Sequence, residues 1–447
     1  MTTIEEQPNV AADTAAPDKA SLITPRDRRR ALFGSAVGSA VEWYDFFLYG
    51  TMSAIVFGPL FFPSDDPVAS QMVALAAFAF AFAIRPIGGI IFSHIGDRIG
   101  RKRTLVITLG MMGVATVLIG FMPTYAQIGV WAPVLLTLLR LVQGLALGGE
   151  WGGGLLMAVE YSPRKKRGFY GAMPQVGALI GLALGNLAAS AASTIFSEEA
   201  FLSYGWRIPF LLSAVLVVIG FWIRHAVDET PSFKAVTASN STKRVPLVST
   251  LRHHWREVLI AIGAKVIETA TFFLFATFTV SYAVSLGFER NEALNAVLIA
   301  AVIGIPMMLV WGSVSDRIGR KRMFVIGTLA IIVGIVPFFW LINLGGFFWL
   351  TVAATFGFGL IWTTYGSVLG TFFAESFPPD VRYTGVSLGY QVGAAIAGGT
   401  APLIATALLV QYEGNYLPVG IFIAVCAVIS LIAVSFAKDR TGQELDS

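Results

Sequence analysis

The sequence contains very little cysteine and few charged residues for its length. Only one of its 447 residues is a cysteine, Cys426, so a scaffold built on disulfides is excluded. Charged residues make up 13% of the chain, against about 25% in an average soluble protein, and so small a share cannot cover a globular surface in water. The short alternating segments of an outer-membrane barrel are also missing. Lipid must therefore surround most of the chain.

Motifs for ATP hydrolysis and for metal binding are missing as well. The chain has no G-x-x-x-x-G-K-[ST] loop and lacks even a Gly-Lys dipeptide. Its histidines, His94, His225, His253 and His254, do not show the H-x-x-x-H spacing of a metal site. We therefore expect neither an ATP-driven pump nor a membrane enzyme, and we expect no metal ion and no cofactor.

What the sequence does contain is a series of long, continuous apolar runs. A helix needs about 20 mostly apolar residues to cross a bilayer. The sequence predicts twelve such spans, at residues 32–61, 71–94, 104–122, 129–159, 168–195, 205–224, 256–286, 292–314, 323–343, 346–374, 383–410 and 416–437. The predicted fold class is an all-α membrane protein with twelve transmembrane helices.

Basic residues are distributed unevenly over the segments that connect these spans. Most of the 31 Lys and Arg residues fall in the tails and in the even-numbered connections, while the opposite connections carry acids such as Asp65, Asp66 and Glu413. By the positive-inside rule, both termini are cytoplasmic. The same bias accounts for the net charge of +4, so the composition requires no nucleic-acid partner.

Polar segments and repeated motifs divide the chain into two halves. We predict a disordered cytoplasmic tail at 1–30, a six-helix bundle at 31–224, a cytoplasmic linker at 225–255, a second six-helix bundle at 256–437 and a cytoplasmic tail at 438–447. The motif Asp-Arg-Ile-Gly-Arg-Lys-Arg stands at 97–103 and again at 316–322. The motif Glu-x-x-Pro-x-x-x-Arg stands at 160–167 and again at 375–382, at nearly the same offset. Two such repeats indicate a duplication, as in transporters with parallel halves.

These motifs resemble those of a known family. The loops at 93–103 and 312–322 resemble the signature loop of the major facilitator superfamily, although Ser93 stands where the first loop usually begins with glycine. Segments 41–46, 85–89, 140–153 and 205–210 resemble the metabolite:proton symporter family, and the chain is most similar to its shikimate branch. That family carries shikimate, 2-oxoglutarate, citrate, other carboxylates and betaines.

The resemblance implies two pseudo-symmetric six-helix bundles that work by alternating access. It also implies that Asp97 and Asp316 brace helix termini across the halves in the outward-facing state, which suits a carboxylate near helix N–H groups. The predicted residues of the conformational loops are Asp97, Arg101, Asp316, Arg320, Glu160, Arg167, Glu375 and Arg382.

Two acids in the first span are the candidates for proton coupling. Ionisable groups inside a bilayer are costly and are functional candidates by default. Glu42 and Asp45 lie three residues apart and share a helix face with Tyr49. Burial disfavours a charged carboxylate, so Asp45 is the predicted proton site, and Glu42 shares the proton or pairs with a cation. The alternative role for Asp45 is a structural hydrogen bond to a neighbouring helix.

Cations in spans 4 and 7 are the candidates for cargo binding. Arg140 offers a planar fork that suits a carboxylate; the alternative is a buried ion pair inside the first half. Lys265 and Glu268 form either a binding-site switch or a permanent ion pair, and Arg85, next to Pro86, is expected to be structural. Further predicted cargo contacts are Gln143, Tyr44, Tyr49, Trp151, Gln175, Trp362, Tyr365, Tyr390 and Gln391.

Taken together, the sequence predicts a proton-coupled importer of a small organic acid, shikimate or a related hydroxylated carboxylate. The alternatives are a carrier of 2-oxoglutarate, citrate, an aromatic acid or a betaine, or a membrane sensor that keeps the fold without transport. The expected partners are the small-molecule cargo, protons and the lipid bilayer. The expected form is a monomer in the bacterial inner membrane.

Overall fold

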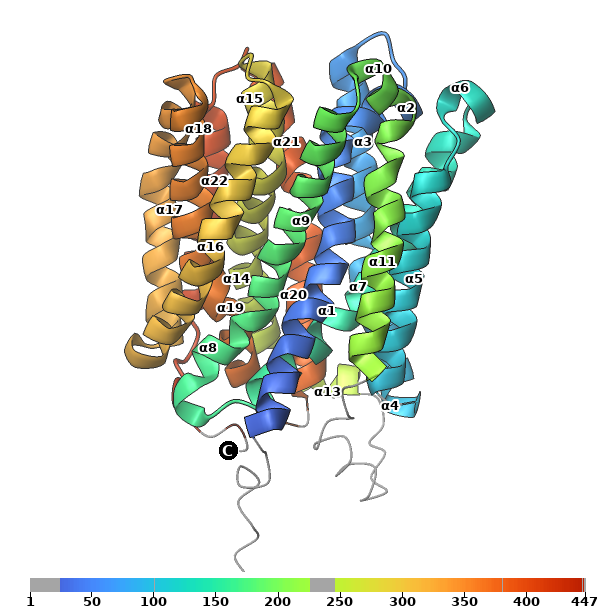
Figure 1. Cartoon of the computed structure of the whole chain (residues 1–447). Helices are drawn as coiled ribbons and strands as arrows, with labels where there is room; N and C mark the ends of the chain where they lie inside the picture. Colours follow the sequence, from blue (N-terminus) through green and yellow to red (C-terminus); the bar gives the residue numbers. More distant parts are fainter. Residues whose placement is uncertain (1–24, 100, 226–245, 380, 444, 446–447) are drawn as a thin grey trace, which may run out of the picture.

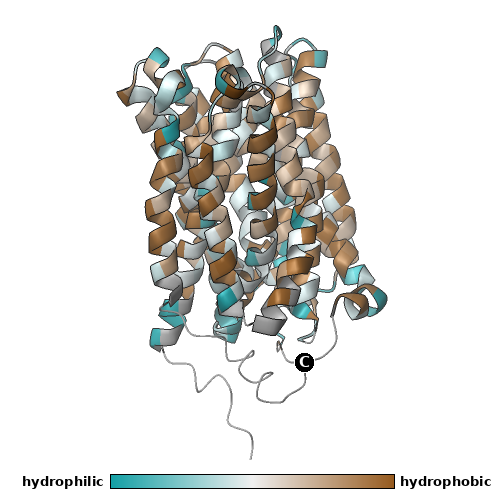
Figure 2. Ribbon diagram, turned by 90° about the vertical axis from the view of Figure 1, so that its right-hand side faces the viewer, coloured by the Kyte–Doolittle hydropathy of each residue, from teal (hydrophilic) through white to brown (hydrophobic). Residues whose placement is uncertain are grey.

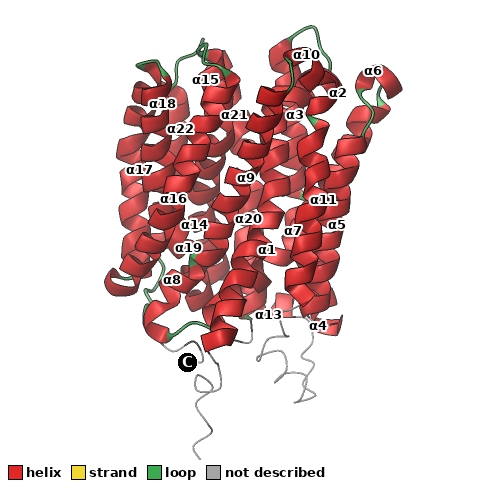
Figure 3. Cartoon of the chain, in the orientation of Figure 1, coloured by secondary structure: helices red, strands yellow, loops and turns green. Residues whose placement is uncertain are grey.

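The computed structural model describes residues 25–99, 101–225, 246–379, 381–443 and 445, and every regular element in these ranges is a helix (Figure 3). Helices satisfy their backbone hydrogen bonds internally, as lipid requires. Within the described residues, ten helices are long and apolar enough to cross a membrane, and a pair bent by 47°, Glu198–Gly205 with Arg207–Trp222, forms an eleventh span. The twelfth is α1 (Pro25–Met52), which is less apolar because four arginines and an aspartate stand at its start and because it carries Glu42 and Asp45. The predicted twelve-helix fold class is confirmed.

The first six spans pack together as one bundle (Figure 1). Helix α1 packs on α9 and α11, α4 packs on α7, and α5 packs on both α7 and α11. The elements of this half are α1, η2 (Ser53–Phe57), α2 (Gly58–Phe61), α3 (Pro67–Ala83), α4 (Arg85–Ile99), α5 (Arg101–Phe121), α6 (Tyr125–Ile128), α7 (Trp131–Glu160), η3 (Arg164–Lys166), α8 (Arg167–Gly171), α9 (Met173–Ile195), α10 (Glu198–Ala200), η4 (Phe201–Gly205) and α11 (Arg207–His225).

The last six spans form the second bundle. Helix α14 packs on α20 and α22, and α17 packs on α19 and α22. The elements are α14 (Trp255–Phe273), η5 (Leu274–Phe278), α15 (Thr279–Ser285), α16 (Arg290–Ile318), α17 (Arg320–Asn343), α18 (Phe347–Ala354), η6 (Thr355–Trp362), α19 (Thr363–Ser376), α20 (Arg382–Ala397), α21 (Thr400–Gln411) and α22 (Leu417–Ser435). Residues 226–245 of the predicted linker lie outside the described residues, and Pro246–His253 of that linker forms helix α13.

Several spans are interrupted near their middle. The second span breaks at Ile84 into α3 and α4, just before Pro86, whose ring cannot donate a backbone hydrogen bond. The π-helical segments η5 and η6 interrupt the seventh and tenth spans, and such irregular turns are frequent at functional sites. Helices α16 and α17 meet at Gly319, whose φ of 101° favours glycine over other residues.

Hydrophobic residues predominate along the middle of the helices, and hydrophilic residues gather toward the two ends (Figure 2). Trp222 and Val333 are each 76% exposed, and Phe348 is 68% exposed. So much exposed apolar surface is rare on a protein in water. It fits a protein whose sides contact lipid.

Glycines let helices approach closely within the first bundle. A Cβ atom on Gly177 of α9 would lie 2.2 Å from the Ala36 carbonyl oxygen of α1, and one on Gly181 would lie 2.6 Å from that of Ala40. Small residues commonly allow such backbone contact between membrane helices. This seam fixes α1, and thereby Glu42 and Asp45, against α9.

The two bundles contact each other at both ends. We call the end with α8 and α13 the basic end (Figure 1), because Arg164, Lys165, Arg317 and Arg320 surround one surface pocket beside α8. At the opposite end, α9 and α16 are joined by hydrogen bonds from Ser190 Oγ to Asn295 Oδ1 (3.3 Å), from Ser193 Oγ to Asn291 Oδ1 (2.5 Å) and from Asn291 Nδ2 to Thr194 Oγ1 (3.3 Å). Any site between the bundles is therefore enclosed at both ends.

Candidate functional site

A small cavity lies between the two bundles, near the middle of the helices. Its volume is about 20 Å³, which is room for about one water molecule and far too little for an organic acid. Both bundles supply its walls. The lining residues are Trp43, Phe47, Phe82, Arg85, Gln175, Ala178, Lys265, Glu268, Thr269, Phe272, Phe273, Trp362, Tyr390 and Ala394. A larger molecule can enter only if the bundles move apart.

An ion pair on α14 lines this cavity. Lys265 donates a hydrogen bond to the carboxylate of Glu268, one turn further along the helix, and both side chains are buried. Gln175 Nε2 of the first bundle donates to Glu268 Oε1 at 2.9 Å, so this carboxylate joins the two bundles. The ammonium of Lys265 also lies 3.6 Å from the ring centroid of Tyr390. Cargo that displaces Glu268 would find a cation and a ring face already in place.

Five predicted cargo residues therefore meet at the cavity: Gln175, Lys265, Glu268, Trp362 and Tyr390. Trp362 Nε1 donates to the backbone carbonyl of Glu268 at 3.0 Å, which holds the π-helical segment η6 against α14. The spacing of Lys265 and Glu268 predicted their pairing correctly. No pattern in the sequence could have predicted the contact of Glu268 with Gln175, because it depends on how the bundles face each other.

Arg85 is the residue whose position the sequence analysis missed. It was expected to be structural, yet it lines the cavity from α4 and is 1% exposed. Its guanidinium carbon lies 3.9 Å from the ring centroid of Phe82 and 4.3 Å from that of Phe46. Pro86 indicates a helix break and thus a structural role for its neighbour, whereas an arginine inside an apolar span indicates a functional one.

Asp45 and Arg140 belong to a second polar network, which lies inside the first bundle and does not line the cavity. Arg140 Nη1 donates to Gln143 Oε1 at 2.8 Å, and Gln143 Nε2 donates to Thr116 Oγ1 at 2.6 Å. Asp45 lies beside the Thr116 hydroxyl and interacts electrostatically with Arg140. The structure thus joins helices α1, α5 and α7 through these groups. Thr116 was not predicted, because threonine is common in apolar spans and carries no charge.

Several other predicted residues surround these two sites. Glu42 is buried and interacts electrostatically with both Asp45 and Arg85, so it lies between the network and the cavity. The Tyr49 ring centroid lies 3.8 Å from the Arg140 guanidinium carbon. Tyr44 points elsewhere, because its hydroxyl donates to the Pro209 carbonyl of α11 at 2.7 Å.

The remaining predicted cargo residues pack at or near the interface without lining the cavity. Trp151 of the first bundle stacks on Tyr390 of the second. Gln391 Nε2 donates across the interface to the Gly148 carbonyl at 3.1 Å. The Tyr365 hydroxyl is hydrogen-bonded to Thr271 Oγ1 at 2.7 Å, inside the second bundle.

At the basic end, Asp316 links the two bundles. Its Oδ1 accepts hydrogen bonds from the Gly168 N–H at 2.9 Å and from Arg320 Nη2 at 2.7 Å, and its Oδ2 accepts one from the Phe169 N–H at 3.3 Å. Gly168 and Phe169 belong to the first bundle, so the contact holds α8 against the end of α16. This is the position that the family resemblance implied for Asp316. The side chains of Asp97 and Arg101 lie outside the described residues.

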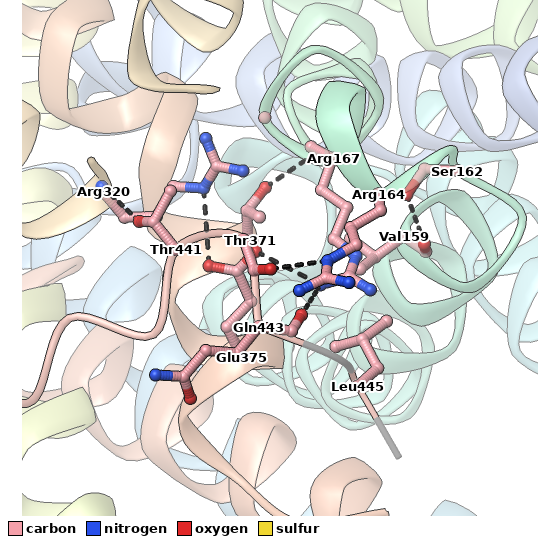
Figure 4. A network of polar contacts seen from close by, with 12 residues as sticks. Val159, Ser162, Arg164, Arg167, Arg320, Thr371, Glu375, Thr441, Gln443 and Leu445 are labelled. Atoms are coloured by element: carbon pink, nitrogen blue, oxygen red, sulfur yellow. Dashed lines mark hydrogen bonds and ion pairs between the residues drawn. The ribbon is translucent and has the colours of Figure 1, made fainter. Parts of the chain in front are cut away.

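Glu375 carries a second contact between the bundles at this end (Figure 4). Its carboxylate lies 3.4 Å from Arg320 Nε and 4.0 Å from Arg167 Nη1. Arg382 donates to the Phe377 carbonyl at 3.1 Å within its own bundle. Glu160 lies at the C-terminus of α7, half-buried. Four of the predicted loop residues, Asp316, Arg320, Arg167 and Glu375, are thus joined in one network.

The segment predicted as a C-terminal tail is part of this network (Figure 4). Its Gly442 carbonyl accepts from Arg164 Nε at 2.6 Å, and its Gln443 carbonyl accepts from Arg167 Nη1. Thr441 Oγ1 accepts from the Arg320 N–H at 2.9 Å. The described part of the segment therefore contacts both bundles, which its polar composition did not predict.

The comparisons with known proteins agree with this geometry. The model of the Major Facilitator Superfamily matches residues 36–402. The "Shikimate transporter" of Escherichia coli K12 is 38% identical over 95% of this chain and 97% of its own length. The "Glycine betaine/proline/ectoine/pipecolic acid transporter OusA" of Dickeya dadantii is 36% identical over 96% of this chain and 87% of its own. The E. coli xylose transporter XylE, in a partially occluded inward open conformation, has a TM-score of 0.72 at 15% identity and covers 94% of this chain and 100% of its own, which shows a shared fold.

Family, fold and site agree. The relatives that match nearly the whole chain are transporters rather than enzymes. A cavity between two six-helix bundles, near the middle of the helices, is where transporters built from two related halves commonly bind their cargo. The protein is a multi-pass membrane transporter of small molecules that belongs to the major facilitator superfamily.

Proposed function

We propose that this transporter is a proton-coupled symporter that imports a small organic acid, a hydroxylated monocarboxylate such as shikimate. The observation that carries the proposal is the position of Lys265 at the cavity, where its partner Glu268 is held by Gln175 of the other bundle. A cargo carboxylate can take the place of Glu268 beside Lys265. Because Glu268 also holds the bundles together, cargo binding and the closure of the bundles become linked.

The proton has a separate place in this proposal. Asp45 lies in the buried network of Arg140, Gln143 and Thr116, away from the cavity. When Asp45 is protonated its attraction to Arg140 is weakened, so α1 and α7 are free to shift relative to each other. Glu42, between the network and the cavity, is in a position to pass this change to the cargo site.

We further propose that the basic end faces the cytoplasm, because basic residues gather there and the positive-inside rule then applies. The membrane would be the bacterial inner membrane. A monoanion that enters with one proton carries no net charge. The pH gradient then drives uptake, with about 1.4 kcal/mol, or tenfold accumulation, for each pH unit.

The experiment is uptake of labelled shikimate into proteoliposomes with an imposed pH gradient. Unlabelled 2-oxoglutarate, citrate, betaine and an aromatic acid are added as competitors, with and without an uncoupler. We expect accumulation that the uncoupler abolishes and that monocarboxylates reduce most strongly. Asp45→Asn should lose accumulation but keep exchange of labelled for unlabelled cargo, and the exposed loop variant Asp65→Asn is the control. Normal accumulation by Asp45→Asn would refute its role as the proton site.

A betaine carrier is the second candidate, and one observation favours it. The cavity is lined by several aromatic rings, among them Trp43, Trp362 and Tyr390, and such rings bind quaternary ammonium groups. Two cations, Arg85 and Lys265, face the same space and would repel the ammonium group. Strong competition by betaine in the uptake assay would favour this alternative. Binding without uptake of any competitor would indicate a sensor.

A further inference from the structure

We propose that Arg85 binds the carboxylate of the cargo from the first bundle, opposite Lys265 of the second, and that the two cations with Glu268 select a monoanion. The proposal rests on the proposed transport of an organic acid and specifies the residue and the charge class. It assigns to Arg85 a role in binding, where the sequence analysis expected a structural one.

The first observation is that Arg85 is buried and that two of its guanidinium nitrogens donate no hydrogen bond. It is 1% exposed, yet its Nε and Nη2 atoms donate no hydrogen bond to any described group. Glu42 acts on the guanidinium electrostatically but accepts no hydrogen bond from Nε or Nη2. Buried polar groups are nearly always satisfied, so unused guanidinium donors at a cavity wall indicate a ligand.

The second observation is that the helix geometry aims this side chain at the cavity. Gly148 of α7 lies so close behind the Arg85 backbone that a Cβ on Gly148 would be 2.2 Å from the Arg85 carbonyl oxygen. The backbone of α7 therefore occupies the space on that side of Arg85, and its guanidinium extends over the ring faces of Phe46 and Phe82. These rings orient a planar fork that can bind a carboxylate through two donors.

The third observation is the balance of charge on the cavity wall. Arg85 and Lys265 are positive and Glu268 is negative, and the other lining residues are neutral. One added carboxylate balances the charges of the residues that line the cavity, and Glu42, which does not line it, acts on Arg85 from outside this set. A dicarboxylate or tricarboxylate leaves unpaired negative charge in a buried place, and a betaine brings its ammonium group next to two cations. The surrounding rings of Phe82, Phe272 and Trp43 suit a compact ring or apolar body on the cargo.

The test is a comparison of acid and amide binding by the purified transporter. Binding of shikimate and of its neutral amide is measured by tryptophan fluorescence and calorimetry, because Trp43 and Trp362 line the cavity. Arg85→Gln should weaken shikimate binding by about 10- to 150-fold, the range for loss of hydrogen bonds to a charged group, and change amide binding less than twofold. Arg256→Gln, an exposed position in the first turn of α14 that does not line the cavity, is the matched control and should change neither.

The outcomes separate this proposal from the proposed function. If the unmodified transporter binds no carboxylate, the organic-acid function fails. If it binds shikimate but Arg85→Gln weakens acid and amide equally, Arg85 is structural and the proposal is overturned. If Arg85→Gln does not fold, Arg85→Lys is measured in the same way: a fall of threefold or more in the preference for acid over amide supports the proposal, and an unchanged preference overturns it. Tighter binding of citrate than of shikimate would overturn the selection for a monoanion.

Discussion

The contacts of Asp316 at the basic end allow the strength of the closure to be worked out from the structure. Its side chain is buried, and it accepts hydrogen bonds from the Gly168 and Phe169 N–H groups of the other bundle. Its bond to Arg320 lies within the second bundle and survives when the bundles separate. Hydrogen bonds to a charged group contribute about 1.5–3 kcal/mol, and the second contact here is long, so we assign about 2 kcal/mol to the pair. The Asp316→Ala substitution should therefore raise the ratio of open to closed molecules at this end about 30-fold.

The assay is the distance between spin labels on exposed residues of the two bundles, at Lys165 and Arg317, measured by pulsed electron resonance in nanodiscs. The buried Cys426 is first replaced by serine so that only the introduced cysteines react. We expect a longer-distance population to grow in Asp316→Ala and to grow less in Asp316→Asn, which keeps an acceptor oxygen. Glu257→Ala, a change at the first turn of α14, is the control. Distance distributions that do not differ between Asp316→Ala and the unmodified transporter would show that this carboxylate does not hold the bundles together.

Three further predictions concern the same interface. Gly168→Val should prevent closure at the basic end, because a Cβ atom at this position would lie 2.2 Å from the Gly312 carbonyl oxygen of α16. Gly154→Ala should be tolerated, because a Cβ atom there would lie 3.9 Å from its nearest neighbour, Ser35 Oγ. The distance between the same two spin labels measures both effects. Lys265→Gln should lower the free energy of unfolding by about 3 kcal/mol, because it leaves the buried Glu268 without its cation. The double variant Lys265→Gln with Glu268→Gln should recover most of this stability but not transport. Thermal melting measures the stability, and the uptake assay measures transport. Removal of residues 438–447 should raise the open population at the basic end, because this segment accepts hydrogen bonds from Arg164 and Arg167 of the first bundle and from the Arg320 N–H of the second. An unchanged label distance would contradict a role for this segment in closure.

Particular residues show how much of this could be predicted from the sequence. The spans follow from length and hydropathy, and the repeated motifs indicated two halves, because both signals are local. The pairing of Lys265 with Glu268 is also local, since it depends only on helical spacing. Whether a buried charge faces the cavity depends on the rotation of its helix against its neighbours, which no short pattern encodes. Arg140 therefore lies inside the first bundle while Arg85 reaches the cavity wall.

The two ends of the interface between the bundles are joined by contacts of different strength, and the contacts at the basic end are the stronger ones. At the basic end the bundles are joined by the carboxylates of Asp316 and Glu375 with N–H and guanidinium groups. At the opposite end the described contacts between α9 and α16 are hydroxyl and amide hydrogen bonds, such as those of Ser193 and Asn291. The guanidinium of Arg290 also lies 5.9 Å from the ring centroid of Phe201 there, without a salt bridge among the described residues. Neutral hydrogen bonds contribute about 0.5–1.5 kcal/mol each, about half as much as bonds to charged groups, so the opposite end should open at lower cost. If the basic end faces the cytoplasm, as we propose, a transporter built in this way opens more readily to the outside, where cargo for import is bound.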